Sequence, residues 1–231
     1  MNKKTAVMAT LILSILLCTV SIFSVKDRAV EADVEVTEET TTEARWELVL
    51  VNDENYLPDD YDIYLLTLSN GEQVDERIYP DLQQMFDDMR ALGHKPMVVS
   101  GYRSAEDQQA ILDAKCREYI NQGYSSDLAK EKALEWVAEP GTSEHQLGIA
   151  VDINPDYSVS KGAGFYEWLK DNAHKYGFIK RYPEDKVEIT GISNERWHYR
   201  YVGKEVAKIM YEENLCLEEY LGNIAETLIN S

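Results

Sequence analysis

The sequence predicts an α+β fold, in a single domain of residues 45–231 that follows an N-terminal membrane helix and an acidic linker. Some segments of the domain repeat apolar residues at helical spacing, whereas others alternate apolar and polar residues as strands do. These segments lack the regular strand–helix–strand order of parallel α/β proteins, and no glycine-rich nucleotide motif is present. Hydrophobic residues form 44% of the 231-residue chain, which excludes a protein that is disordered throughout.

Residues 1–26 predict a signal anchor or a signal peptide. Two basic residues, Lys3 and Lys4, precede an almost wholly apolar run at residues 5–25, which is long enough to cross a bilayer as a helix. The run exceeds the apolar core of a typical cleaved signal peptide, and its basic flank places the rest of the chain outside the cell. We therefore expect a single-pass cell-membrane protein with an extracytoplasmic domain; secretion after signal cleavage is the alternative.

Residues 27–44 predict a disordered linker. Within them, residues 31–43 are rich in Glu and Thr and contain no Lys or Arg, so the segment repels itself and has little to bury. Such a linker would hold the folded domain away from the membrane.

The charge and the cysteines exclude several classes of protein. The chain carries 23 Lys and Arg against 42 Asp and Glu, a formal net charge of −19. Nucleic-acid binding needs clustered basic residues, so we expect no nucleic-acid partner. Three cysteines are too few for a disulfide scaffold. Within the domain, Cys116 and Cys216 could pair outside the cell or remain free, and the sequence leaves both open.

The first elements of the domain are predicted from composition and spacing. Residues 46–51 have the composition of a strand, and a tight turn is expected at residues 69–71. A helix is expected at residues 79–92, because four apolar residues share one of its faces: Leu82, Met85, Phe86 and Met89.

The later elements are separated by cap and turn residues. A short buried strand is expected at residues 97–100, before a helix that Ser104 caps and that runs to Asn121. The remaining predictions are a helix that Ser126 caps and that runs to about residue 138, a strand at 149–153, a helix at 164–176, a strand at 197–202 and a helix at 204–214.

Two histidines, His145 and His198, lie in segments whose pattern indicates a functional site. On the strand at residues 149–153, the apolar residues alternate with Asp152, which therefore faces away from the core. Gly148 lets the chain turn before this strand, so that His145 and Asp152 can converge. In the second segment, His198 alternates with aromatic residues and leaves their face. Glu195 lies three residues earlier and reaches the face of His198 only if the chain bends near Arg196.

Two imidazoles and a carboxylate form a normal zinc first shell with one position open to water. The same set also forms the facial triad of non-haem iron oxygenases. A third segment, Ser100-Gly101-Tyr102-Arg103-Ser104, lies between a predicted strand and a helix. A guanidinium fixed on that turn can bind a carboxylate or a developing oxyanion, although the spacing alone favours a solvent-facing Arg103 at the start of a helix.

These segments together resemble a known signature. The matching motifs, in order, are Ser100-Gly101-Tyr102-Arg103-Ser104, Ser143-x-His145-x-x-Gly148-x-Ala150-x-Asp152 and Glu195-x-Trp197-His198. They are similar to those of the VanY-type zinc D-alanyl-D-alanine carboxypeptidases, which belong to the LAS metallopeptidases. That group also includes D,D-dipeptidases and shares its fold with the hedgehog signalling domain. The resemblance covers about residues 48–203 and implies a hedgehog-like domain with a small antiparallel sheet flanked by helices.

The resemblance also implies roles for residues. One zinc ion would be held by His145, Asp152 and His198, with Glu195 as the catalytic base and Arg103 as a substrate or transition-state contact. Two further positions, Ser143 and Gln109, match positions near the substrate. The remaining histidines, His94 and His174, fall outside the motifs and are interpreted as structural.

The implied reaction is hydrolysis of the terminal D-Ala-D-Ala bond of peptidoglycan stem peptides, with release of D-Ala. An L,D-carboxypeptidase and a D,D-dipeptidase on the same scaffold are the near alternatives. A non-catalytic cell-wall-binding module is the alternative of another class, since a fold alone does not fix a function. We expect the stem peptides and the membrane as partners, and a monomer.

Overall fold

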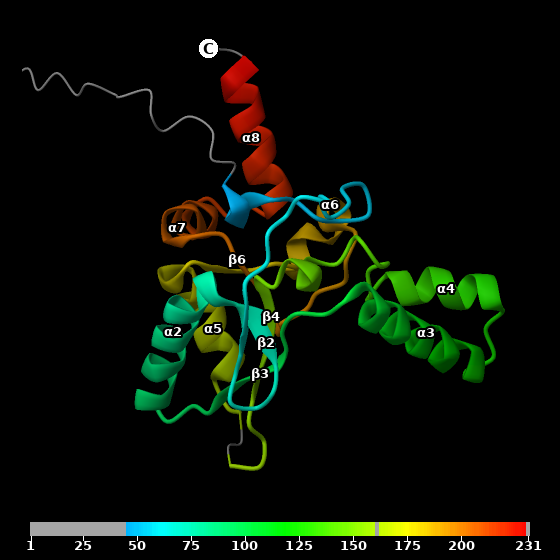
Figure 1. The fold of residues 1–231 in the computed structure, drawn as a ribbon, viewed down its shortest axis with the longest axis horizontal. Helices are drawn as coiled ribbons and strands as arrows, with labels where there is room; N and C mark the ends of the chain where they lie inside the picture. Colours follow the sequence, from blue (N-terminus) through cyan, green and yellow to red (C-terminus); the bar gives the residue numbers. More distant parts are fainter. Residues whose placement is uncertain (1–44, 160–161, 230–231) are drawn as a thin grey trace, which may run out of the picture. The chain divides into compact units, whose positions relative to one another are not determined.

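A four-stranded antiparallel sheet forms the centre of the computed structural model, which describes residues 45–159 and 162–229 (Figure 1). Its strands lie in the spatial order β3-β4-β6-β5. Their bounds are Pro96–Ser100 for β3, Ala150–Pro155 for β4, Phe178–Lys180 for β5 and His198–Tyr201 for β6. The predicted α+β class is confirmed. The expected membrane helix and linker lie outside the described residues. No helix within the described ranges is both long and apolar enough to span a bilayer.

Helices cover one face of this sheet. The core joins the alternating residues Ile149, Val151 and Ile153 to the apolar faces of α2 (Tyr79–Ala91) and α5 (Phe165–Asn172). The four apolar residues expected on the first of these helices are all buried. The opposite face of the sheet is therefore left for the polar side chains that alternate with the core residues.

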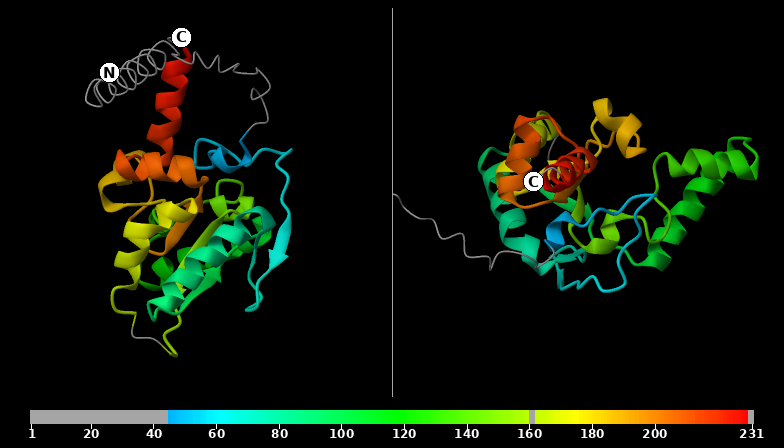
Figure 2. Two further views of the ribbon diagram at one scale, coloured as in Figure 1. Left: turned by 90° about the vertical axis from the view of Figure 1, so that its left-hand side faces the viewer. Right: turned by 90° about the horizontal axis from the view of Figure 1, so that it is seen from above.

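Two helical pairs lie beside the sheet. The first is α3 (Ala105–Asn121) with α4 (Ser126–Leu134), which pack on one another and stand apart from α2 and α5 in Figures 1 and 2. The second is α7 (Lys204–Glu212) and α8 (Leu217–Ile229), at the end of the domain opposite the β4–α5 turn. A smaller hairpin of β1 (Leu65–Thr67) and β2 (Gln73–Asp75) encloses the predicted turn at residues 69–71.

Short helical turns complete the chain. Their bounds are Trp46–Leu48 for η2, Glu76–Ile78 for η3, Glu144–Leu147 for η4, Ala173–Tyr176 for η5, Glu184–Lys186 for η6 and Val187–Thr190 for α6.

The strand predicted at residues 46–51 is wrong, since the segment begins with η2 and continues without a strand partner. The residues of this segment make other contacts instead. Trp46 stacks on Tyr201, with 5.9 Å between ring centroids. The carbonyl oxygens of Glu47 and Val49 accept hydrogen bonds from Arg200 Nη2, at 3.0 and 2.8 Å. A buried guanidinium thus satisfies backbone groups that a neighbouring strand would otherwise have to satisfy.

The cap positions are confirmed at one helix and shifted at another. Ser104 forms a reciprocal capping box with Asp107 at the start of α3, as expected. The next helix is capped by Ser125, whose hydroxyl accepts from the amide of Leu128, and not by Ser126. It also ends at Leu134, earlier than predicted.

Candidate metal centre

Asp152 and His198 lie directly opposite each other on the neighbouring strands β4 and β6. The residues on either side of Asp152 are fully buried in the core, so its carboxylate faces the other side of the sheet, as the alternation predicts. Asp152 Oδ1 lies 3.1 Å from His198 Nδ1. Two candidate ligands are therefore placed by the register of one strand pair.

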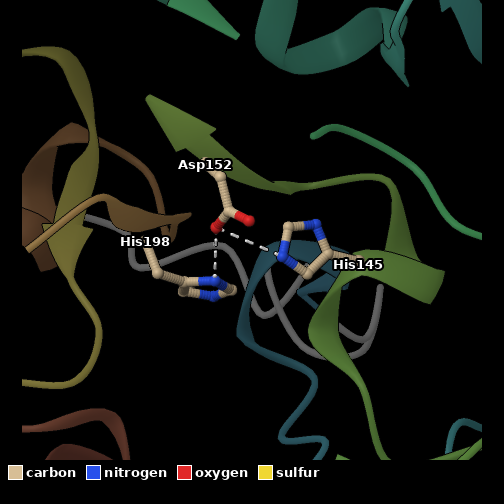
Figure 3. A group of neighbouring side chains, drawn as sticks. All are labelled: His145, Asp152 and His198. Carbon is tan, nitrogen blue, oxygen red and sulfur yellow. Dashed lines mark hydrogen bonds and ion pairs between the residues drawn. The ribbon is translucent and has the colours of Figure 1, made fainter. Parts of the chain in front are cut away.

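The third ligand comes from the turn before β4. His145 lies on η4, and Gly148 then reverses the chain with φ +72°, a conformation that favours glycine. His145 Nε2 consequently lies 3.4 Å from the same carboxylate oxygen (Figure 3). One potential ligand atom from each of His145, Asp152 and His198 lies within 4.8 Å of the others, which is close enough for the three to hold one metal ion.

Hydrogen bonds fix which ring nitrogen of each histidine faces this cluster. His145 Nδ1 donates to the carbonyl oxygen of Gly101 at 2.7 Å, so its Nε2 carries the lone pair. On His198 the roles are exchanged, because Nε2 faces Glu144 Oε2 at 3.5 Å and Nδ1 faces Asp152. Both rings have a partner behind them, which is the usual arrangement of metal-binding histidines.

Glu195 enters the cluster from the segment before β6. The chain bends at Arg196 and Trp197, as the sequence interpretation required. Glu195 Oε2 then lies 3.8 Å from His198 Nδ1. Burial raises the pKa of Glu195 to about 7, an effect that His198 and Arg103 oppose and Asp152 reinforces. A carboxyl group with such a pKa can accept and return a proton near neutral pH.

Arg103 is fixed inside the site and does not face solvent. Its Nη2 lies 3.0 Å from both His145 Nε2 and Asp152 Oδ2, on the side where a metal ion would bind. Its Nε donates to Ser100 Oγ at 2.8 Å, and its Nη1 donates to Gln108 Oε1 at 3.0 Å. The simple solvent-facing interpretation of this residue is wrong.

The turn that carries Arg103 is held by the β1–β2 hairpin. The amide of Tyr102 donates to the carbonyl oxygen of Gln73 at 2.6 Å, and the amide of Gly101 donates to Glu72 at 2.9 Å. A Cβ atom at Gly101 would lie 2.0 Å from that Gln73 oxygen, so no side chain fits there.

The two residues matched to the substrate region differ in their placement. Ser143 is buried and lines the cleft of the metal cluster. Gln109 is exposed on α3 and bonds to Asp113 one turn later, so the structure does not bring it to the cleft. Its neighbour Gln108 is buried, lines the cleft and donates to the carbonyl oxygen of Ala138 at 2.8 Å. Of these two neighbouring glutamines, it is therefore Gln108, and not the Gln109 that sequence similarity selected, whose side chain reaches the cleft.

A buried ionic network behind His198 was not predicted. Glu144 Oε1 accepts from Arg181 Nε at 2.8 Å and from Arg200 Nη1 at 2.9 Å, and all three side chains are fully buried. Burial alone would raise the pKa of Glu144, but the two guanidinium groups outweigh it and hold that pKa well below its usual range. Only spatial proximity reveals this network, since nothing in the spacing along the chain indicates it.

Two cavities with shared wall residues lie at or beside the cluster. The cleft that holds the three metal ligands, Arg103 and Glu195 has a volume of about 50 Å³. A second cavity of about 160 Å³ adjoins it, and both are lined by Ala138, Tyr182 and Ile192. Loops from two parts of the chain form these walls and are joined by a hydrogen bond from the Ser193 amide to the Glu135 carbonyl oxygen, at 3.1 Å.

The donor set fits zinc. Two neutral imidazoles and one carboxylate supply three ligands with the fourth position left for water or substrate, and each is backed by a second hydrogen-bonding group. The remaining histidines, His94 and His174, lie elsewhere and pack against Phe165 and Tyr211, as expected of structural residues.

Comparison with known families identifies the scaffold. The sequence model of the VanY family, described as D-alanyl-D-alanine carboxypeptidase, matches residues 71–204. The chain belongs to the VanY family. A D-alanyl-D-alanine carboxypeptidase of Enterococcus faecalis (strain ATCC 700802 / V583) is 58% identical over 179 residues, which cover 78% of this chain and 67% of the relative.

Solved VanY structures share the fold. A mutant of the vancomycin resistance D,D-pentapeptidase VanY from a VanB-type cassette, in complex with Zn(II), matches with a TM-score of 0.74 and 58% identity, over 76% of this chain and 99% of that one. VanYB in complex with D-alanine-D-alanine matches with a TM-score of 0.75 and 58% identity, over 77% of this chain and 98% of that one. The hedgehog-like, D,D-peptidase-like architecture expected from the motifs is thereby confirmed.

Proposed function

We propose that this VanY-family chain is a zinc-dependent carboxypeptidase that hydrolyses the terminal D-Ala-D-Ala bond of peptidoglycan stem peptides and releases D-Ala. The observation that carries this proposal is the convergence of His145, Asp152 and His198 within 4.8 Å, with Glu195 beside them. The 58% identity to VanY proteins described with Zn(II) and with D-alanine-D-alanine supports the same assignment.

The zinc ion and the residues around it would each have a separate role in the reaction. Zinc, when bound, polarises the scissile carbonyl and lowers the pKa of water to near 7. Glu195 takes the proton of the attacking water and delivers it to the leaving amine. Arg103 directs a guanidinium at the same place and can stabilise the negative charge that develops on oxygen. His145 and His198 keep their orientations because Gly101 and Glu144 hold the opposite nitrogens.

The cavities favour a substrate longer than a dipeptide. The cleft beside the metal ligands is small, which suits the single methyl side chain of a terminal alanine. The adjoining cavity of about 160 Å³ gives the preceding residues of a stem peptide a place to bind. This favours a carboxypeptidase over a dipeptidase.

The site geometry gives less support to an oxygenase or to a binding module. A non-haem iron oxygenase has no need of a base placed as Glu195 is, and a wall-binding module has no need of a buried, well-oriented ligand set. An L,D-carboxypeptidase would use the same ligands and base, and is separated from our proposal by its substrate.

We further propose a location from the sequence of the first 44 residues, and an oligomeric state for the whole protein. We expect a single-pass membrane anchor with the domain outside the cytoplasm, where it meets peptidoglycan, and a monomer. Accessibility of the domain to protease in intact cells, and its release into the medium if the anchor is cleaved, distinguish the two topologies.

The test is hydrolysis by the zinc-loaded full chain. Incubation with a pentapeptide stem that ends in D-Ala-D-Ala should yield a product one alanine lighter by mass spectrometry. Glu195→Ala should abolish this release and still bind zinc, whereas Glu188→Ala, at an exposed position on α6, should leave it unchanged. Trimming of the tetrapeptide only, or of free dipeptide only, would assign the L,D or the dipeptidase activity, and zinc binding without hydrolysis would assign a binding module.

A further inference from the structure

The start of α8 is joined to the metal centre through a chain of buried charges. Arg181, directly after β5, donates with Nε to Glu144 and with Nη1 to Glu218 on α8, at 2.8 and 2.9 Å. Its Nη2 donates to the second carboxylate oxygen of Glu218, so the contact is bidentate. Glu144 in turn faces the ring nitrogen of His198 that points away from the metal cluster.

The charges in this group cancel. Glu144 and Glu218 balance Arg181 and Arg200, and the side chain of Glu218 is only 14% exposed whereas the other three are fully buried. Without Glu218, the three remaining charges would sum to +1 immediately behind a ligand of a divalent cation. Arg181 would also lose both of its contacts on one side, which would free it to pull Glu144 away from His198.

We propose that Glu218 is a positioning residue of the zinc centre, which acts through Arg181 and Glu144 on the orientation of His198. The inference rests on the proposed zinc site. Helix α8 therefore contributes to the metal centre through Glu218, in addition to packing Leu217 against the apolar residues of α7. Groups that orient a metal-binding histidine from behind typically contribute 10–100-fold to metal affinity.

The neighbouring glutamate provides a matched control. Glu219 follows Glu218 on the same helix, but it pairs with Lys186 at 2.8 Å and accepts from the amide of Cys216, away from Arg181. Glu218→Gln and Glu219→Gln remove the same charge from adjacent positions, and only the first touches the network.

The test measures zinc affinity of the full chain by competition with a chelator. We expect Glu218→Gln to weaken zinc binding about tenfold or more, and Glu219→Gln to match the wild type. Glu144 contacts His198 directly, so Glu144→Gln should weaken zinc binding at least as much as Glu218→Gln does. The visible spectrum of the cobalt-substituted protein should shift in Glu218→Gln, since it reports the geometry of the ligands, and Glu218→Asp should restore part of the affinity.

Equal zinc affinity in folded Glu218→Gln and wild type would overturn the inference. Circular dichroism checks the fold. If Glu218→Gln does not fold, Arg181→Lys replaces it, because a lysine keeps the charge but cannot make the bidentate contact with Glu218. Unchanged zinc affinity in that variant would overturn the inference equally. Absence of zinc binding in the wild type would instead overturn the proposed zinc enzyme.

Discussion

Glu195 Oε2 lies 3.8 Å from Nδ1 of His198, so the side chains of these two residues, three apart in the chain, lie on the same side of the sheet. A straight strand would have placed them on opposite faces of the sheet. The bends at Arg196 and Trp197, just before β6 begins, bring the carboxylate back to the metal side. One local irregularity therefore brings the proposed base to the candidate ligand set.

Gln108 and Gln109 offer a test of which glutamine serves the site. Gln108→Ala should lower kcat/KM about tenfold or more, because Arg103 loses the acceptor that holds its Nη1, and a buried donor or acceptor left without a partner costs ~1–3 kcal/mol. Gln109→Ala should have the activity and stability of the wild type, since Gln109 is exposed. Steady-state kinetics on a pentapeptide and urea unfolding give the two readouts. A larger effect at Gln109 would restore the role that sequence similarity gave it.

Glu195 should make the zinc-free protein less stable as the pH rises. Its pKa is raised from 4.5 to about 7, so between those values the folded state keeps a proton that the unfolded state has released. Stability from this group is therefore greatest below pH 4.5 and is lost as the pH rises through 7. Glu195→Gln should be more stable than the wild type at pH 8, by up to ~3 kcal/mol, and not at pH 4.5. Urea unfolding at the two pH values measures the difference, and parallel pH dependences for the two proteins would contradict it.

The two cysteines of the domain should react at very different rates. Both are free thiols, Cys116 is half-buried on α3, and Cys216 is only 3% exposed. Burial raises the pKa of Cys216 to about 11, which leaves little thiolate at neutral pH. Iodoacetamide should therefore modify Cys116 first, as peptide mapping under native conditions will show. A Cys116–Cys216 linked peptide in the non-reduced digest would contradict the prediction.

The larger cavity should bind the part of the substrate that precedes the scissile bond. Asp53 is exposed at its rim, so Asp53→Trp should obstruct the cavity without disturbing the core. We expect a several-fold rise in KM for a pentapeptide with little change in kcat. Glu54→Trp, one residue away and outside the lining, should leave both parameters unchanged. Kinetics that are identical in the two variants would place the stem peptide elsewhere.

The ligand set could be predicted from sequence because it depends on local rules. Alternation along β4 and β6 determines which way Asp152 and His198 point, and Gly148 marks the turn that returns His145. The motif resemblance supplied the role of Glu195, although the bend that positions it is not visible in the spacing.

The surroundings of the site could not be predicted because they depend on contacts between distant segments. Glu144 precedes a ligand in the sequence and reads as an ordinary surface acid, yet it is fully buried between Arg181 and Arg200. The strand expected at residues 46–51 was wrong for the same reason, since Arg200 takes the place of a strand partner. Nor did the pattern indicate β5, which is only three residues long. Helix α8 was not expected either, although its first turn carries the acidic residues that are typical of a helix start.

Gly101 ties the catalytic turn to a hairpin that carries no catalytic residue. Gly101 lies two residues before Arg103, and its carbonyl oxygen orients the ring of His145. Because Gly101 has no side chain, the backbone of Gln73 can lie directly against it. A shift of the hairpin should therefore move the imidazole of His145 and the guanidinium of Arg103 together. Variation in β1 and β2 can for that reason retune catalysis at a distance, whereas Gly101→Ala, small as it is, should cost more activity than many larger changes on the surface.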